Sequence, residues 1–260
     1  MIKVKTMTGI NPSRDKEIDR DSQTIFKQFG HSEIGPLHKK YQQPNQDAFC
    51  HYAYSWGELI ALSDGLGSHT LSQYGSQAAC DAAHRLLDQW HQSPELSATD
   101  LLTMFHQNWL QNLAGQDISQ CGCTILMVLR LESTLFWAQL GDGLSVLFRN
   151  DTSEPECLTR KSDLFSNQTE ALKEKFNPTQ WQMGYFDVNV CRGFFLCSDG
   201  IADDLELGQQ AAFFKQLYTQ YRSLTEQQII VDIKQWLQHW PVPRHSDDKT
   251  LVAMMVKEAS

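Results

Sequence analysis

The sequence contains no apolar run that could cross a membrane, because none of its hydrophobic stretches approaches the roughly 18 residues that a bilayer-spanning helix needs. No apolar core of a secretory signal follows the charged start at residues 1–5. Lysine and arginine nowhere form a run, and the formal net charge of the 260 residues is −9. We therefore expect no membrane partner, no nucleic-acid partner and a cytoplasmic location.

The seven cysteines lack the spacing of a disulfide framework, and no second Cys/His pair is evident that would complete a zinc site with Cys121 and Cys123. We interpret them as reduced thiols that serve as small core residues. A nucleotide-binding loop is also missing, because the glycines around Leu66 lack the downstream glycine of a dinucleotide fingerprint and no Gly-Lys-Ser/Thr follows. The chemistry must come from other residues.

The 260 residues, 41% of them hydrophobic, are enough to fill a substantial core. Residues 1–22 are mixed and charged, and we expect them to form a loosely ordered lead-in. The patterned remainder, residues 23–260, is expected to fold as a single domain. A monomer is the expected state, because the final helix and strand are committed to the same core.

Hydrophobic periodicity predicts runs of strands separated by two pairs of helices. Strands are predicted at 24–33, 47–54, 57–63, 123–131, 134–140, 144–149, 181–190, 193–197 and from Thr250 onward. Helices are predicted at 79–90, 98–113, 208–221 and 225–240, with a short helical patch at 170–175. This order is typical of an α+β fold, here a four-layer sandwich of two antiparallel β-sheets packed face to face and flanked by helix pairs.

Acidic residues follow or precede several of the predicted strands. Three apolar runs stop at the pairs Asp64-Gly65, Asp142-Gly143 and Asp199-Gly200, and Asp247-Asp248 precedes the last strand. A single Asp-Gly pair is most often an ordinary turn. Several carboxylates that converge at rigid strand ends would repel one another unless cations lay between them, so the pattern indicates an oxygen-ligand site for hard divalent metals.

Six motifs occur in the order and spacing found in one enzyme family. They are Gln46-Asp47-Ala48, Asp64-Gly65-Leu66-Gly67-Ser68-His69, Gly122-Cys123-Thr124, Gly141-Asp142-Gly143, Ser198-Asp199-Gly200-Ile201-Ala202-Asp203 and Asp247-Asp248-Lys249-Thr250. Over about residues 24–257 the chain resembles the metal-dependent type 2C protein serine/threonine phosphatases. The approach through residues 35–47 is similar to a bacterial-type branch of that family. The resemblance implies the same sandwich fold.

The resemblance also implies a centre of two Mn²⁺ or Mg²⁺ ions, with room for a third. The implied ligands are Asp47, Asp64, the carbonyl of Gly65, Asp142, Asp199, Asp203 and Asp247. Asp64 would bridge two ions, Asp47 would act directly or through water, and Asp142 and Asp203 would join Asp199 around the third. The implied reaction is hydrolysis of phosphoserine or phosphothreonine by a hydroxide that bridges two ions about 3.5–4 Å apart.

The chain departs from the family where the substrate phosphate would bind. Gln42 stands at a position where many members carry a phosphate-binding arginine. We consider His38, Lys39 and Gln42 as the phosphate-binding residues, with Lys40 and Arg244 as other sources of positive charge. For His38, a role in supporting the metal ligands is the alternative.

His69 follows the first acidic motif and is, with Asp47 and Asp64, a candidate catalytic residue. Its imidazole titrates near neutral pH and could assist protonation of the leaving group, although a solvated or supporting loop histidine is the alternative. Two other functions stay open: a pseudophosphatase-like module that binds a phosphoprotein without hydrolysis, and a metallohydrolase of small phosphoesters. The segment 150–180 stands where the family carries a mobile flap, and we expect it to set substrate choice.

Overall fold

The computed structural model describes residues 25–158, 170–206 and 208–257, so the expected lead-in at 1–22 lies outside the described residues. The strands are β1 (Phe26–Glu33), β2 (Ala48–Ala53), β3 (Gly57–Ser63), β4 (Ile125–Leu131), β5 (Thr134–Leu140), β6 (Leu144–Arg149), β7 (Glu156–Cys157), β8 (Gln182–Asp187), β9 (Cys191–Cys197) and β10 (Lys249–Val256). The helices are α1 (Pro36–Tyr41), α2 (Ser72–Gln92), α3 (Ala98–Asn112), α4 (Asp199–Ala202), α5 (Gln210–Tyr221) and α6 (Glu226–Gln238).

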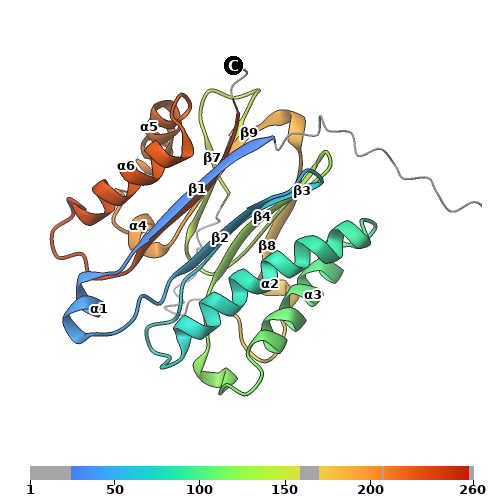
Figure 1. Ribbon diagram of the computed structural model, residues 1–260, viewed down its shortest axis with the longest axis vertical. Helices are drawn as coiled ribbons and strands as arrows, with labels where there is room; N and C mark the ends of the chain where they lie inside the picture. The colour runs from blue at the N-terminus through green and yellow to red at the C-terminus, as the bar shows by residue number, and fades with distance from the viewer. Residues whose placement is uncertain (1–24, 159–169, 207, 258–260) are drawn as a thin grey trace, which may run out of the picture.

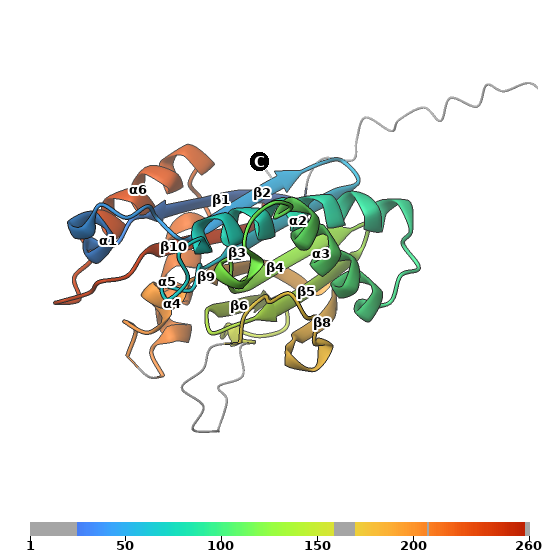
Figure 2. The ribbon, with the colours of Figure 1, turned by 90° about the horizontal axis from the view of Figure 1, so that it is seen from below.

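The strands form two antiparallel sheets with the orders β1-β10-β9-β6-β7 and β2-β3-β4-β5-β8. Helices α2 and α3 cover the outer face of the second sheet, and α5 and α6 cover the outer face of the first (Figures 1 and 2). A third hydrophobic cluster fills the space between the sheets. The predicted four-layer α+β sandwich is confirmed.

Strand β3 shows why the central strands carry nearly uninterrupted apolar sequences. Successive side chains of a strand point to opposite faces of the sheet. Leu59 and Ala61 pack toward α2 and α3, whereas Ile60 and Leu62 pack toward the other sheet. Because both faces of the central strands are buried, no polar residue is needed at every second position.

The helix pairs follow the predicted pattern, with differences at short elements. Helix α3 begins with a capping box in which Ser97 and Asp100 each accept from the other's backbone N–H. Helix α2 spans 21 residues and is longer than predicted. The predicted helical patch at 170–175 is wrong, because Leu172 is buried and its backbone instead pairs with Cys123.

A buried ion pair joins β3 to β4 and also contacts the other sheet. Arg130 donates from Nε to Glu58 Oε2, and both side chains are almost completely inaccessible to solvent. The second carboxylate oxygen, Glu58 Oε1, accepts from the backbone N–H of Phe26 at 3.0 Å. Glu58 therefore links β1 to the opposite sheet.

The described cysteines are all free thiols, and Cys121 and Cys123 are buried as core residues. Among the helices in the described ranges, none combines the length and the apolar character that crossing a bilayer requires.

Candidate metal centre and phosphate site

Strand pairing brings the acidic motifs to one end of the sandwich. Ala48 at the start of β2 pairs with Ser63 at the end of β3, which places Asp47 and Asp64 side by side. Cys197 at the end of β9 pairs with Leu251 near the start of β10 and with Leu144 at the start of β6. The residues that follow or precede these positions, which include Asp142, Asp199 and Asp247, therefore occupy the same edge.

Asp47 is a buried carboxylate held by a hydroxyl from the opposite sheet. Thr250 donates from Oγ1 to Asp47 Oδ2 at 2.6 Å. Burial raises the pKa of Asp47 to about 7, the charges of Asp248 and Asp199 add to the rise, and the Thr250 hydrogen bond opposes it. Its other oxygen, Oδ1, is buried without a hydrogen-bond partner among the described residues.

Asp64 and Asp199 interact with each other across the gap between the sheets. Burial raises the pKa of Asp64 well above its ordinary value, and the charges of Asp47 and Asp199 raise it further. Burial likewise raises the pKa of Asp199 to about 6, although a side-chain hydrogen bond with Asp64 lowers it. Two carboxyl groups can share a hydrogen bond only when one of them holds a proton.

Asp142, Asp203 and Asp247 form the exposed rim of this acidic group. Their charges contribute to the raised pKa of Asp199. Within the described parts of the chain, no three His, Cys, Asp or Glu side chains are arranged so that they could hold one metal ion as they stand. In this arrangement the charges of Asp47, Asp199 and Asp247 all contribute to the raised pKa of Asp64, so the carboxyls lie close enough to repel one another.

The donor atoms nevertheless fit a hard divalent cation. All the candidate side chains offer carboxylate oxygens, which suit Mg²⁺ and Mn²⁺ better than zinc. Asp47 Oδ1 and Asp199 Oδ1 are buried with no hydrogen-bond partner in the described ranges. A cation there would supply the missing partner and offset the repulsion among these carboxylates.

The glycines of two Asp-Gly pairs are required by close packing of neighbouring loops. A Cβ on Gly200 would lie 2.1 Å from the carbonyl oxygen of Asp248, and one on Gly65 would lie 2.9 Å from that of Gln46. Neither glycine has a positive φ. Close approach of the backbone, rather than a left-handed turn, therefore explains why glycine follows aspartate.

Asp248 organises the site, a role that sequence reasoning missed. Its buried carboxylate accepts from the backbone N–H groups of Gly35 at 2.6 Å and Gln46 at 2.7 Å, and contacts His38 Nδ1 at 2.8 Å. It thereby fixes the loop that carries Asp47 to the start of β10. The only signal in the sequence is its place beside Asp247.

The three candidate phosphate-binding residues lie on or next to α1. His38 is buried and contacts Asp248. Lys39 forms an ion pair with Glu33, with 2.6 Å between Nζ and Oε1. Gln42 is exposed and ends α1 in a left-handed conformation, with φ of 56°. None of the three contacts an acidic side chain of the Asp47, Asp64 and Asp199 group through a described hydrogen bond.

His69 is fixed by a backbone contact. The N–H of Gly122 donates to His69 Nδ1 at 3.0 Å, so the neutral ring carries its hydrogen on Nε2. The loop that carries His69 has a second hydrogen bond to Gly122, because the N–H of Leu66 donates to the Gly122 carbonyl.

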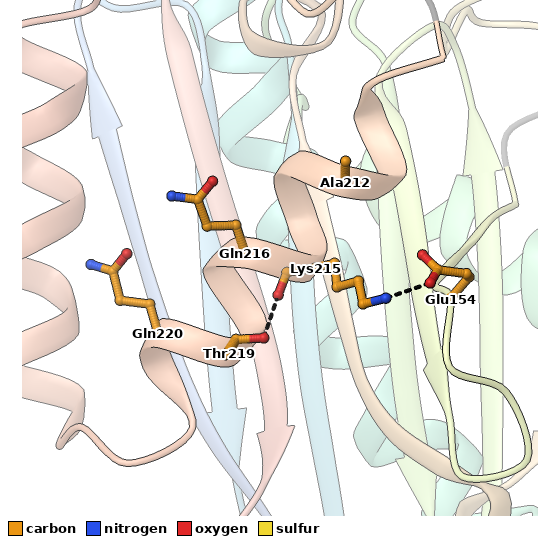
Figure 3. A pocket seen from close by; sticks show the side chains of 6 residues that line it. All are labelled: Glu154, Ala212, Lys215, Gln216, Thr219 and Gln220. Carbon is orange, nitrogen blue, oxygen red and sulfur yellow. Dashed lines mark hydrogen bonds and ion pairs between the residues drawn. The ribbon is translucent and has the colours of Figure 1, made fainter.

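Two surface hollows differ sharply in chemistry. A cavity of 210 Å³ adjoins the acidic group and is lined by Asp199, Gly200, Asp203, Asp204, Pro243, Arg244, His245, Ser246, Asp247 and Lys249. A hollow of 640 Å³ lies on α5, where Glu154 pairs with Lys215 beside exposed glutamines (Figure 3). It contains none of the candidate ligands. The smaller cavity therefore belongs to the candidate site.

The profile of one family, protein phosphatase 2C, matches residues 34–240 of the sequence. The chain belongs to the protein phosphatase 2C family. It is accordingly assigned to a family of protein phosphatases. The match ends before Asp247, and the structure places the last acidic pair beside the matched part of the site, because Asp248 accepts from the backbone N–H of Gln46.

Solved structures of this family share the fold. The catalytic domain of the serine/threonine protein phosphatase PstP, in complex with 2 manganese ions, is 18% identical, with a TM-score of 0.62, and the alignment covers 91% of this chain and 100% of that one. PstP/Ppp from Mycobacterium tuberculosis is 18% identical, with a TM-score of 0.65 and coverages of 90% and 100%. Stp1 from Staphylococcus aureus is 15% identical, with a TM-score of 0.64 and coverages of 90% and 96%. No curated protein sequence matches the chain.

Proposed function

We propose that this phosphatase removes phosphate from phosphoserine and phosphothreonine of protein substrates by direct, metal-dependent hydrolysis. The observation that carries the proposal is the group of carboxyls at the strand ends, in which Asp47 is buried and Asp64 and Asp199 are half-buried. Asp47, Asp64 and Asp199 have raised pKa values, and two of them present oxygens that no described residue satisfies. Desolvating carboxyl groups in this way lowers the stability of the folded state unless they bind a cation, so such groups are typical of functional sites.

Two Mn²⁺ or Mg²⁺ ions would be held by Asp47, Asp64, the Gly65 carbonyl, Asp199 and Asp247, and a third by Asp142 and Asp203 with Asp199. The PstP structure, which contains manganese, supports this choice of ion. When bound, such ions would acidify a water molecule and offset the negative charge of the phosphoryl group.

The chain's own residues then have separate roles. Thr250 orients Asp47 through the hydrogen bond to Oδ2 and leaves Oδ1 available for a ligand. Asp248 holds the loop before β2 against β10, so the spacing of Asp47 and Asp247 is fixed by two rigid strands. His69 keeps its hydrogen on Nε2, and we propose that this N–H donates a hydrogen bond to the leaving oxygen of the substrate, which takes its proton from water.

The segment 150–180 is proposed to select the substrate. Residues 159–169 of it lie outside the described residues. The part of the segment from residue 170 onward is attached near the site. The N–H of Leu172 donates to the Cys123 carbonyl at 2.8 Å, and the N–H of Thr124, which follows Cys123 in the chain, donates to the Asp64 carbonyl at 2.7 Å. A phosphoprotein substrate would therefore meet this segment beside Asp64. We further propose that the protein acts as a cytoplasmic monomer.

Comparison of substrates tests the proposal. With Mn²⁺ present, we expect phosphate release from a phosphothreonine or phosphoserine peptide to exceed that from a phosphotyrosine peptide and from a small phosphoester. Preferential hydrolysis of the small ester would indicate a metabolite phosphatase instead. Tight binding of the phosphopeptide without release would indicate the binding module.

A further inference from the structure

The 210 Å³ cavity beside Asp199 contains basic as well as acidic groups. Three basic residues, Arg244, His245 and Lys249, line it together with the carboxylates. Arg244 and His245 come from the loop between α6 and β10, and Lys249 is the first residue of β10, far along the chain from α1. The cavity therefore brings positive charge directly next to the proposed metal ligands Asp199 and Asp247.

Only one of these cations is available to a ligand. Lys249 is buried, lies 3.3 Å from Asp204 Oδ2 and stacks over the ring of Trp240. Arg244 is exposed, and its side chain forms no ion pair or hydrogen bond with any residue that the structure describes. On α1, the Lys39 ammonium group forms an ion pair with Glu33.

A second polar group in the cavity also lacks a partner. His245 Nδ1 is buried and forms no hydrogen bond with the described residues. A buried polar atom without a partner is costly, which is a reason to expect a ligand there. Because Asp199 Oδ1 is unsatisfied in the same cavity, the cavity offers both an anion-binding side and a cation-binding side.

The backbone holds Arg244 in an uncommon conformation. Its φ is 66°, in the left-handed region that non-glycine residues rarely adopt. The loop is attached to α1, because the N–H of Leu37 donates to the Ser246 carbonyl at 3.1 Å. Such conformations are often found where a side chain must be presented to a ligand.

We propose that Arg244, with His245 beside it, binds the phosphoryl group of the substrate. This inference rests on the proposed function, because a phosphate enters a cavity lined by four aspartates only when metal ions neutralise them. The planar guanidinium group can donate two parallel hydrogen bonds to phosphate oxygens, and the imidazole can donate a third. Arg244 thus provides the phosphate contact from the β10 side of the site instead of from α1.

The competing role for Arg244 is that of a counter-ion to the carboxylates. The two roles predict different measurements on Arg244→Ala, Arg244→Lys and the matched control Arg85→Ala, which removes an exposed arginine from α2. If Arg244 binds phosphate, Arg244→Ala raises KM for a phosphothreonine peptide about tenfold or more, and Arg244→Lys lies in between. Added guanidinium ion partly restores the alanine variant, whereas Arg85→Ala behaves as wild type.

Binding measured without turnover makes the test independent of activity. A peptide with a phosphonate in place of the phosphate is titrated into each Mn²⁺-loaded protein by calorimetry. We expect Arg244→Ala to lose about tenfold or more in affinity for this peptide while Mn²⁺ affinity stays within about twofold of wild type. Unchanged peptide affinity, or a change confined to Mn²⁺ affinity, would overturn the inference.

Failure of the proposed function gives a different pattern. In that case wild-type protein releases no phosphate from any peptide, and the phosphonate titration alone decides the role of Arg244. Loss of binding in Arg244→Ala supports the phosphate contact even then. Absence of binding in wild type, or equal binding in both proteins, refutes it.

Discussion

Replacement of Asp47 by asparagine should stabilise the metal-free protein at alkaline pH, although it removes a ligand. The pKa of Asp47 is raised from its ordinary 3.8 to about 7, chiefly by burial. A carboxyl whose pKa is higher in the folded state contributes most stability below pH 3.8, and this stability is lost as the pH rises through 7. Each pH unit corresponds to about 1.4 kcal/mol, so the full loss is about 4 kcal/mol.

Asparagine keeps the shape of the side chain and can still accept from Thr250, but it carries no charge. Its amide nitrogen would occupy the place of Oδ1, which has no partner among the described residues, at a cost of about 1–3 kcal/mol. We therefore expect a net gain of about 2 kcal/mol in unfolding free energy at pH 8.

Urea unfolding in EDTA at pH 5.5 and pH 8 measures this effect. Wild type should lose stability between the two pH values, and Asp47→Asn should lose distinctly less. In saturating Mn²⁺ the order should reverse at pH 8, because binding to the native state stabilises wild type more than the variant. A variant that is less stable than wild type in EDTA at pH 8, with the same pH dependence, would refute the electrostatic reasoning.

Three further substitutions test other parts of the account. Asp64→Asn should abolish turnover and most of the Mn²⁺-induced rise in melting temperature while leaving the circular dichroism spectrum unchanged; wild-type activity would remove the site assignment. Arg130→Met should lower the unfolding free energy by about 3–5 kcal/mol, because it leaves the Glu58 carboxylate buried without its cation, and the Arg130→Met/Glu58→Gln double variant should recover part of that loss in urea titrations. Gly200→Ala should lower stability by about 1–3 kcal/mol or more, since its Cβ would meet the Asp248 carbonyl at 2.1 Å; an unchanged melting temperature would contradict the packing explanation for the Asp-Gly pairs.

The layers of the fold could be predicted because each long element carries a repeated pattern. The continuous apolar run of β3 and the repeats of three and four in α2 reflect burial on both faces of the strand and on one face of the helix. The short helices α1 and α4 carry no such repeat and were not predicted. The helix prediction for residues 170–175 is wrong for the opposite reason. The local composition favours a helix, but the backbone pairing of Leu172 with Cys123 determines the conformation.

The candidate site could be predicted only where a motif is local. Asp64 and Asp199 mark strand ends in the sequence, and the strand register places them at one edge. The contacts of Asp248 with Gly35 and Gln46 join residues about 200 positions apart, and no local pattern indicates them. The sequence makes His38 a candidate for phosphate binding, and it does not indicate the long-range contact of the His38 ring with Asp248.

The central claim is that these carboxyls hold ions that make the chain a phosphoprotein phosphatase. The most direct measurement is phosphate release from a phosphothreonine peptide by the purified protein, with Mn²⁺ and with EDTA in parallel. The account predicts release in Mn²⁺ and none in EDTA, with activity restored when Mn²⁺ is added back. Equal release in both conditions, or no release although calorimetry shows Mn²⁺ bound, would contradict it.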